Sequence, residues 1–148
     1  MGVELLVHGH IWNLVTCHLV PAAWGPNSNQ TEDRWEVCIQ GLEQAFSSKR
    51  RIIFGMDANA SLGVSVDKFV GPYRVDGAND SRATRLRQLL RILRLCVPAT
   101  FFRKPVSKMY THKFSQIDFV CVSANMRQTV AYAWSAESLQ YPSDHWAQ

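Results

Sequence analysis

The chain has 148 residues, of which 47% are hydrophobic and 19% charged, a composition typical of a folded globular protein. This length is enough for one domain with a real core, and the formal net charge of +4 mildly favours an anionic partner. No apolar run approaches the roughly 18 residues that suggest a membrane span, and no basic segment followed by an apolar block opens the chain. We therefore expect neither a membrane span nor a signal peptide.

The first third predicts a strand–helix–strand unit. Residues 4–7 and 11–19 read as two strands, joined as a hairpin by His8-Gly9-His10. After a loop rich in Gly, Pro and Asn, Thr31 is expected to cap a helix. One apolar face recurs at helical spacing in that helix: Trp35, Cys38, Ile39, Leu42 and Phe46. The apolar run 52–54 then predicts a buried strand ended by Gly55, so parallel strands with a crossover helix are expected.

The rest of the chain predicts a second helix and several strands. Residues 65–79 read as a surface loop, and Asp80 or Ser81 is expected to begin a helix that runs to about Leu95. Its buried face consists of Leu86, Leu89, Leu90 and Leu93. Its flanks carry arginines that are either solvated surface or phosphate contacts: Arg85, Arg87, Arg91 and Arg94. Strands are expected at residues 97–102, 109–114, 116–123 and 128–134.

The cysteines are consistent with a reducing compartment. Cys17, Cys38, Cys96 and Cys121 are widely spaced and contain no CxxC pair, so they do not fit a structural zinc site. Their apolar neighbours favour free thiols packed as small core residues. We therefore expect an intracellular location, with the nucleus as one candidate compartment.

Asp57 and Asn59 are the first candidate functional residues. They follow the apolar run directly, and residues two apart on an extended backbone point the same way. Their small neighbours, Ala58 and Ala60, leave room for a ligand. The alternative is a plain turn, since Asp and Asn favour turns without any function.

Three further pieces complete the candidate set. His18 lies at a strand end, Asp118 lies within an apolar strand, and Asp144-His145 lies in a loop near the C-terminus. A carboxylate is costly to bury unless it is paired or has a function. Each piece alone is common, but in combination they supply what metal-assisted phosphoester hydrolysis needs, namely oxygen ligands for a hard cation and a carboxylate-paired histidine.

Four sequence motifs extend this set into a family resemblance. Residues 55–60 (GMDANA) resemble a GDFNA motif with one extra residue between the glycine and the aspartate. Residues 116–120 (QIDFV) resemble an R/Q-I-D-Y/F motif, residues 143–146 (SDHW) an SDH motif, and residues 18–21 (HLVP) an H-x-x-P segment. From residue 11 to 146 the chain thus resembles the endonuclease/exonuclease/phosphatase superfamily, which is DNase I-like. More loosely, it is similar to endonuclease domains of non-LTR retroelements.

The resemblance implies a fold, a cofactor and a substrate. The fold would be α/β, a partial four-layer α/β sandwich with a mixed sheet and flanking helices. The cofactor would be Mg²⁺ or Mn²⁺, with Asp144 next to the metal. The substrate would be nucleic acid, DNA foremost, cleaved to a 5′-phosphate and a free 3′-hydroxyl.

It also implies a role for each remaining residue. Asp57 would activate or orient the attacking water, and Asn59 would position that water or the phosphate. His145 would act at the scissile phosphate as base or electrostatic stabiliser, held by Asp118. His18 would donate to the phosphate oxygens.

The chain departs from the family pattern near both ends. The family has an N-terminal Asn and a metal-binding Glu, but only about ten residues precede the strand that leads to His18. Glu4, in VELLVH, does not match the expected Q-E motif, and three residues follow His145. We therefore expect a single domain, 1–148, truncated at both ends and lacking much of the N-terminal sheet. A partner or a missing upstream segment would cover the exposed sheet face.

Three alternatives to a metal-dependent endonuclease stay open. A catalytically inactive remnant, at most a binding module, is suggested by the missing Glu and by the extra residue in GMDANA. A phosphatase acting on a small or lipid phosphoester is possible within the superfamily, although SQIDFV in place of a W-C-D-R-type motif and the positive charge favour a nuclease. A plain α/β protein would use the same Asp and His residues as turns and caps.

Overall fold

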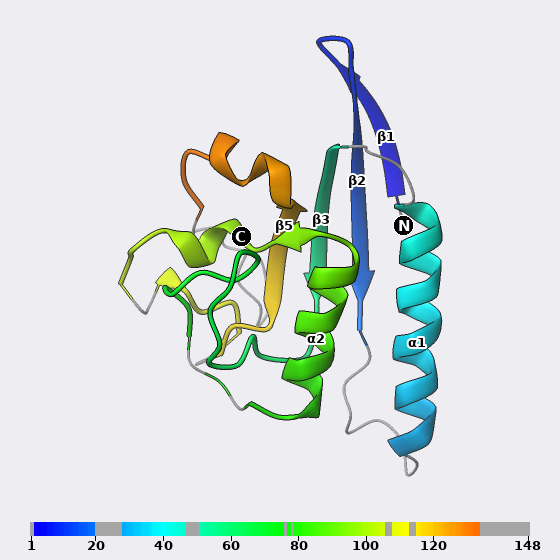
Figure 1. Cartoon of the computed structure of the whole chain (residues 1–148), viewed down its shortest axis with the longest axis vertical. Coiled ribbons are helices and arrows are strands. Elements are labelled where there is room, and N and C mark those ends of the chain that lie inside the picture. The colour runs from blue at the N-terminus through cyan, green and yellow to red at the C-terminus, as the bar shows by residue number, and fades with distance from the viewer. Residues whose placement is uncertain are drawn as a thin grey trace.

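A five-stranded mixed sheet with two α-helices forms the described part of the chain (Figure 1). This computed structural model describes residues 2–19, 28–46, 51–75, 77, 79–105, 108–112 and 115–133. The elements are β1 (Gly2–Val7), β2 (His10–His18), α1 (Ser28–Ala45), β3 (Arg51–Asp57), α2 (Ser81–Ile92), β4 (Leu95–Cys96) and β5 (Asp118–Ser123). The strand order is β1-β2-β3-β5-β4, and the predicted α/β class is confirmed.

The predicted hairpin and crossover are both present. β1 and β2 pair antiparallel, and the turn between them uses positive φ angles at His8 and Gly9, as tight hairpin turns do. β2 and β3 pair in parallel, with α1 between them in the chain, while β5 runs antiparallel to β3. The C-terminal ends of β2 and β3 therefore meet the N-terminal start of β5 at one end of the sheet.

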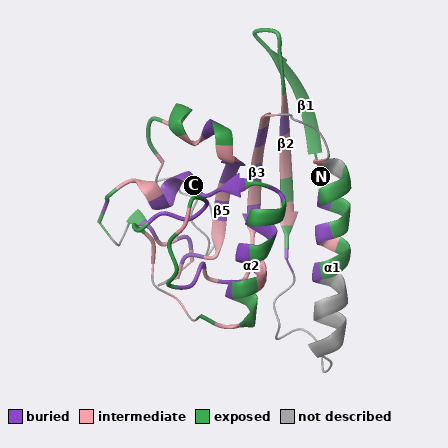
Figure 2. Cartoon of the chain, in the orientation of Figure 1, coloured by how far each residue is buried: buried purple, intermediate pink, exposed green. Residues whose placement is uncertain are grey.

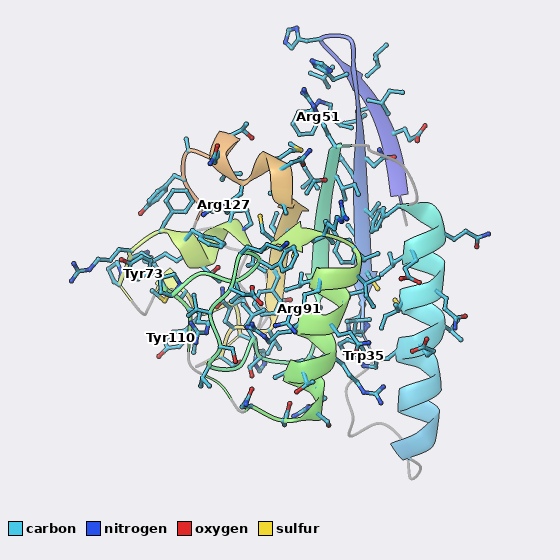
Figure 3. All side chains as sticks on the ribbon, viewed as in Figure 1. Trp35, Arg51, Tyr73, Arg91, Tyr110 and Arg127 are labelled. Carbon is cyan, nitrogen blue, oxygen red and sulfur yellow. The ribbon has the colours of Figure 1, made fainter. Side chains whose placement is uncertain are left out.

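Both helices pack on one face of the sheet. β3 alternates strictly, so Ile52, Phe54 and Met56 are buried on that face, and Phe119 and Cys121 of β5 join them. The helices contribute apolar residues to the same cluster: Trp35, Ile39 and Leu42 from α1, and Leu86, Leu89 and Leu90 from α2. Trp35 extends from α1 into this core (Figure 3), and Figure 2 shows the buried residues where the helices face the sheet.

The opposite face of the sheet is less covered. The side chains that alternate to this face at the sheet centre, Leu14, Ile53 and Val120, are half-buried. Farther out, Val3, Leu5 and Val7 of the edge strand β1 are exposed on the same face, because they pair with Leu14, Trp12 and His10. The β1–β2 hairpin extends past the other strands and is exposed along most of its length (Figures 1 and 2).

α2 begins where it was predicted. The Asp80 side chain accepts the Ala83 N–H at 2.9 Å, which is a standard N-cap, and the four predicted leucines are buried. The prediction for its arginines needs correction at Arg87, which is not a solvated flank. Arg87 is buried and donates to the backbone oxygen of Ser65 and to Asp67, which also accepts from Arg91. These arginines hold the loop after β3 against α2.

Several predicted element boundaries were wrong. α1 begins at Ser28, so Thr31 lies inside it, and β3 continues through Gly55 because Gly55 pairs with Thr16 on one side and Val120 on the other. Pro98–Phe101 forms a 3₁₀ helix rather than a strand, since Pro98 has no N–H for a ladder. Ala124–Thr129 is also a 3₁₀ helix, and residues 109–112 contain only an isolated bridge from His112 to Ser115.

No helix within the described ranges is long and apolar enough to span a membrane. The four cysteines are free, as predicted; Cys96 and Cys121 are buried, whereas Cys17 and Cys38 are half-buried.

Candidate active site

Three of the predicted site residues form a row across the end of the sheet. His18 of β2 is in register with Asp57 of β3, which is in register with Asp118 of β5. Residues that pair across strands place their side chains on the same face, about 5 Å apart from strand to strand. The three side chains therefore lie side by side on the sheet face opposite α1 and α2, although they come from three strands that are far apart in the chain.

His18 and Asp57 are in direct contact. The imidazole Nε2 lies 3.2 Å from Asp57 Oδ2, within reach of a hydrogen bond if Nε2 carries the proton. The His18 side chain is 64% exposed and the Asp57 side chain 20%, so the imidazole stands at the surface and the carboxylate below it. The backbone supports the pair, because the Leu19 N–H donates to the backbone carbonyl oxygen of Asp57 at 2.8 Å.

Asn59 reaches the same point by a turn, which corrects the prediction of an extended Asp-x-Asn segment. β3 ends at Asp57, whose Oδ1 accepts the Asn59 N–H at 3.0 Å, and Asn59 adopts a φ of 46°. Asn tolerates this left-handed conformation better than most residues. Its side-chain Nδ2 donates to the Leu19 oxygen at 2.8 Å and lies 3.4 Å from His18 Nε2. The segment after Asp57 is thus a turn, and this turn brings the side chains of Asp57 and Asn59 together at His18.

Thr111 holds the start of β5, a role that the sequence did not indicate. Its side chain is fully buried, and its Oγ1 accepts the N–H groups of Ile117 and Asp118, each at 3.0 Å. The Ile117 oxygen in turn accepts the Ala58 N–H at 2.8 Å, which joins this segment to the turn after Asp57. Thr111 therefore fixes the backbone that positions Asp118 beside Asp57.

Arg82 is a second residue that the sequence did not single out. It lies in the first turn of α2, partly exposed, and donates to the N-cap Asp80 at 3.0 Å. Its Nη1 also donates to the backbone oxygen of Asn59 at 3.4 Å. A positive charge thus stands next to the turn that carries Asn59. The only local signal for this position of Arg82 is the sequence Asp80-Ser81-Arg82, which places an arginine at a helix start close to an acidic N-cap.

The oxygen ligands that could hold a divalent cation are the carboxylates of Asp57 and Asp118. Carboxylate oxygens suit a hard cation such as Mg²⁺, and these two lie on adjacent strands on one face. Among the described residues, however, no three His, Cys, Asp or Glu side chains are grouped so that they could bind a metal. Asp144 and His145 lie outside the described residues, so the metal-site and catalytic predictions for them stay predictions.

The sheet, the covering helices and the polar row at the strand ends define an α/β protein with the DNase I-like fold. Solved structures of this fold superpose on nearly the whole chain. A 3′-5′ exonuclease, NExo, from Neisseria meningitidis aligns over 98% of this chain with a TM-score of 0.65 and 15% sequence identity. A structure of the 3′ phosphatase NExo from Neisseria bound to product DNA hairpin aligns equally well, with 14% identity.

These comparisons establish the fold and leave the activity open. At 14–15% sequence identity, structural similarity shows a shared fold. A shared fold does not by itself determine function. The chain spans 62% of the length of each NExo chain. Neither the protein-family models nor the curated proteins contain a match to this sequence.

Proposed function

We propose that this chain hydrolyses phosphodiester bonds in nucleic acid, foremost DNA, as a divalent-metal-dependent endonuclease. The observation that carries the proposal is the row of His18, Asp57 and Asp118 at the sheet end, joined by Asn59. The net charge of +4 suits a polyanionic substrate. The DNA hairpin bound to NExo, a protein of the same fold, is consistent with such a substrate.

The geometry suggests a catalytic role for each of the three residues Asp57, His18 and Asn59. Asp57 Oδ1 is held by the Asn59 N–H and Oδ2 faces His18, so the carboxylate orientation is fixed while lone pairs remain for a water proton. The exposed imidazole of His18 stands where a phosphate oxygen would arrive. The Asn59 side chain, oriented by its bond to the Leu19 oxygen, would position the water or the phosphate.

The proposed cofactor is Mg²⁺ or Mn²⁺. Asp57 and Asp118, together with Asp144, would hold the cation, which would supply Lewis-acid stabilisation of the charge that develops on the phosphate. His145, oriented by Asp118, is proposed to act at the same phosphate. The looser likeness to retroelement endonuclease domains rests on the sequence motifs alone.

Nicking of supercoiled plasmid by the full chain tests the proposal. Nicked product should form with Mg²⁺, disappear with a chelator, and fall sharply in Asp57→Ala and His145→Ala. Asn59→Gly is the sharper variant at the turn, since glycine keeps the positive φ while removing the side chain. A nicking rate that is unchanged by the chelator and by Asp57→Ala would refute the assigned chemistry. A folded chain with no activity on any substrate would favour the inactive-remnant alternative.

A second candidate is removal of a 3′-terminal phosphate from DNA. It is favoured by the fold shared with a 3′ phosphatase bound to its DNA hairpin product. A hairpin oligonucleotide carrying a 3′-phosphate separates the two candidates: phosphate release without nicking of closed circular plasmid would identify a terminal phosphatase, and nicking of the plasmid would identify an endonuclease.

A further inference from the structure

Two half-buried cysteines from different elements lie in contact beside the site. Cys17 precedes His18 in β2, and Cys38 lies on α1, on the face of the sheet that the helices cover. Their sulfur atoms are 3.4 Å apart. The other two cysteines, Cys96 and Cys121, have no exposed surface, so the thiol pair differs from them in access.

The contact makes the two thiols chemically unequal. The hydrogen bond from Cys17 lowers the pKa of Cys38 to about 7, and this outweighs the opposing effect of partial burial. The same hydrogen bond, together with partial burial, raises the pKa of Cys17. The proton therefore stays on Cys17, and Cys38 is the sulfur that carries thiolate, the nucleophilic form. Burial raises the pKa of both Cys96 and Cys121, which leaves these two inert by comparison.

We propose that Cys17 and Cys38 form a thiol pair that a small-molecule disulfide, such as oxidised glutathione, converts to a disulfide. The Cys38 thiolate attacks one sulfur of glutathione disulfide, which forms a mixed disulfide and releases one glutathione thiolate. The Cys17 thiol then gives its proton to the released glutathione thiolate and attacks the Cys38 sulfur, which releases the second glutathione as its thiolate. The protein thiols are oxidised by two electrons, and one glutathione disulfide is reduced to two glutathiones.

Closing the bond has a defined structural effect. A disulfide requires a sulfur separation of about 2.05 Å, so the two sulfurs, which lie 3.4 Å apart, must approach by about 1.4 Å. The bond would tie α1 to β2 at the residue next to His18. This inference stands on the thiol geometry and is independent of the proposed nuclease activity.

Titration of the folded full chain with glutathione redox buffers tests the proposal. On oxidation, intact mass should fall by two hydrogens, and a non-reducing digest should contain Cys17 linked to Cys38. Cys17→Ser should stop at a glutathione adduct on Cys38, whereas Cys38→Ser should form no internal disulfide. Cys96→Ser serves as the matched control and should oxidise like the parent chain.

A measurement on the unaltered chain keeps the test decisive if a variant fails to fold. Brief alkylation of the native reduced protein should label Cys38 at least tenfold faster than Cys96 or Cys121, and prior oxidation should block that labelling. Labelling of Cys17 ahead of Cys38, or a persistent Cys38–glutathione adduct with no internal disulfide in the parent chain, would overturn the proposal.

Discussion

His18 and Asp57 face each other across the ends of two parallel strands, with the imidazole Nε2 3.2 Å from a carboxylate oxygen. Two groups in contact that serve one reaction should not act independently. We expect His18→Ala and Asp57→Ala each to lower the nicking rate by about 10²- to 10⁴-fold, and the double variant to lose much less than the product of the two effects.

The control for this double-mutant cycle is His10→Ala. His10 is exposed at the opposite end of β2, so its removal should leave the rate unchanged. Plasmid nicking measured at one Mg²⁺ concentration gives all the rates. Strict multiplicativity of the two single effects would mean that the pair does not work as a unit.

The Thr111 hydroxyl should matter for stability through the two N–H groups that it accepts. Thr111→Val has nearly the same shape but leaves both N–H groups buried without their acceptor, so unfolding free energy should fall by about 1–3 kcal/mol or more. Thr111→Ser keeps the oxygen and should cost far less. Urea unfolding measures both, and equal stability of the valine and serine variants would show that the hydroxyl is dispensable.

Asp67 should make stability depend on pH below neutrality. Partial burial alone would raise the pKa of Asp67, but the N–H groups of Phe69 and Val70 and the guanidinium groups of Arg91 and Arg87 outweigh it and lower the pKa. Because the folded pKa lies below the unfolded value of about 3.9, the stabilisation is complete above that value and is lost as pH falls through the folded pKa.

Asp67→Asn tests this dependence. At neutral pH the variant should lose about 3 kcal/mol, because it leaves the buried Arg87 guanidinium, 6% exposed, without its counter-charge. The gap between the parent and the variant should shrink as pH falls below about 4. Unfolding free energies measured from pH 7 to pH 2 give the curve; a gap that widens on acidification would contradict the sign.

Two glycines should respond in opposite directions to alanine. A Cβ at Gly71 would collide with the Thr100 backbone oxygen, so Gly71→Ala should destabilise the fold by about 1–3 kcal/mol. A Cβ at Gly41, inside α1, meets nothing within 4 Å, so Gly41→Ala should stabilise it by about 0.5–1 kcal/mol. Thermal unfolding of both variants checks the pair, and a drop in Tm for Gly41→Ala would be the contrary result.

The parts of the fold with strong local patterns could be predicted from sequence. The apolar run at residues 52–54 identified the buried strand β3, and the leucine spacing with Asp80 identified α2 and its start. At Pro98–Phe101 the proline was a local signal against the predicted strand, but the hydrogen bond that ties this 3₁₀ helix to Gly71 could not be predicted from nearby residues. The Thr100 hydroxyl donates to the Val97 oxygen and accepts the Gly71 N–H, 29 positions away.

For the candidate site, the residue types could be predicted but not the way they are held. An extended backbone was predicted to point the side chains of Asp57 and Asn59 the same way. In the structure, a turn with a left-handed conformation at Asn59 brings them together instead. Thr111 carries no local signal, since the amides that it accepts belong to a segment six and seven positions away. Such contacts follow from tertiary packing, which local propensity does not encode.

The row of His18, Asp57 and Asp118 also bears on how the chain folds. Each side chain comes from a different strand, so no fragment with only one of these strands can assemble the row. Pairing β2 with β3 must first close the long connection that contains α1, and such non-local pairings slow folding. The His18–Asp57 contact is therefore expected to form late, so its appearance would mark the completion of the sheet.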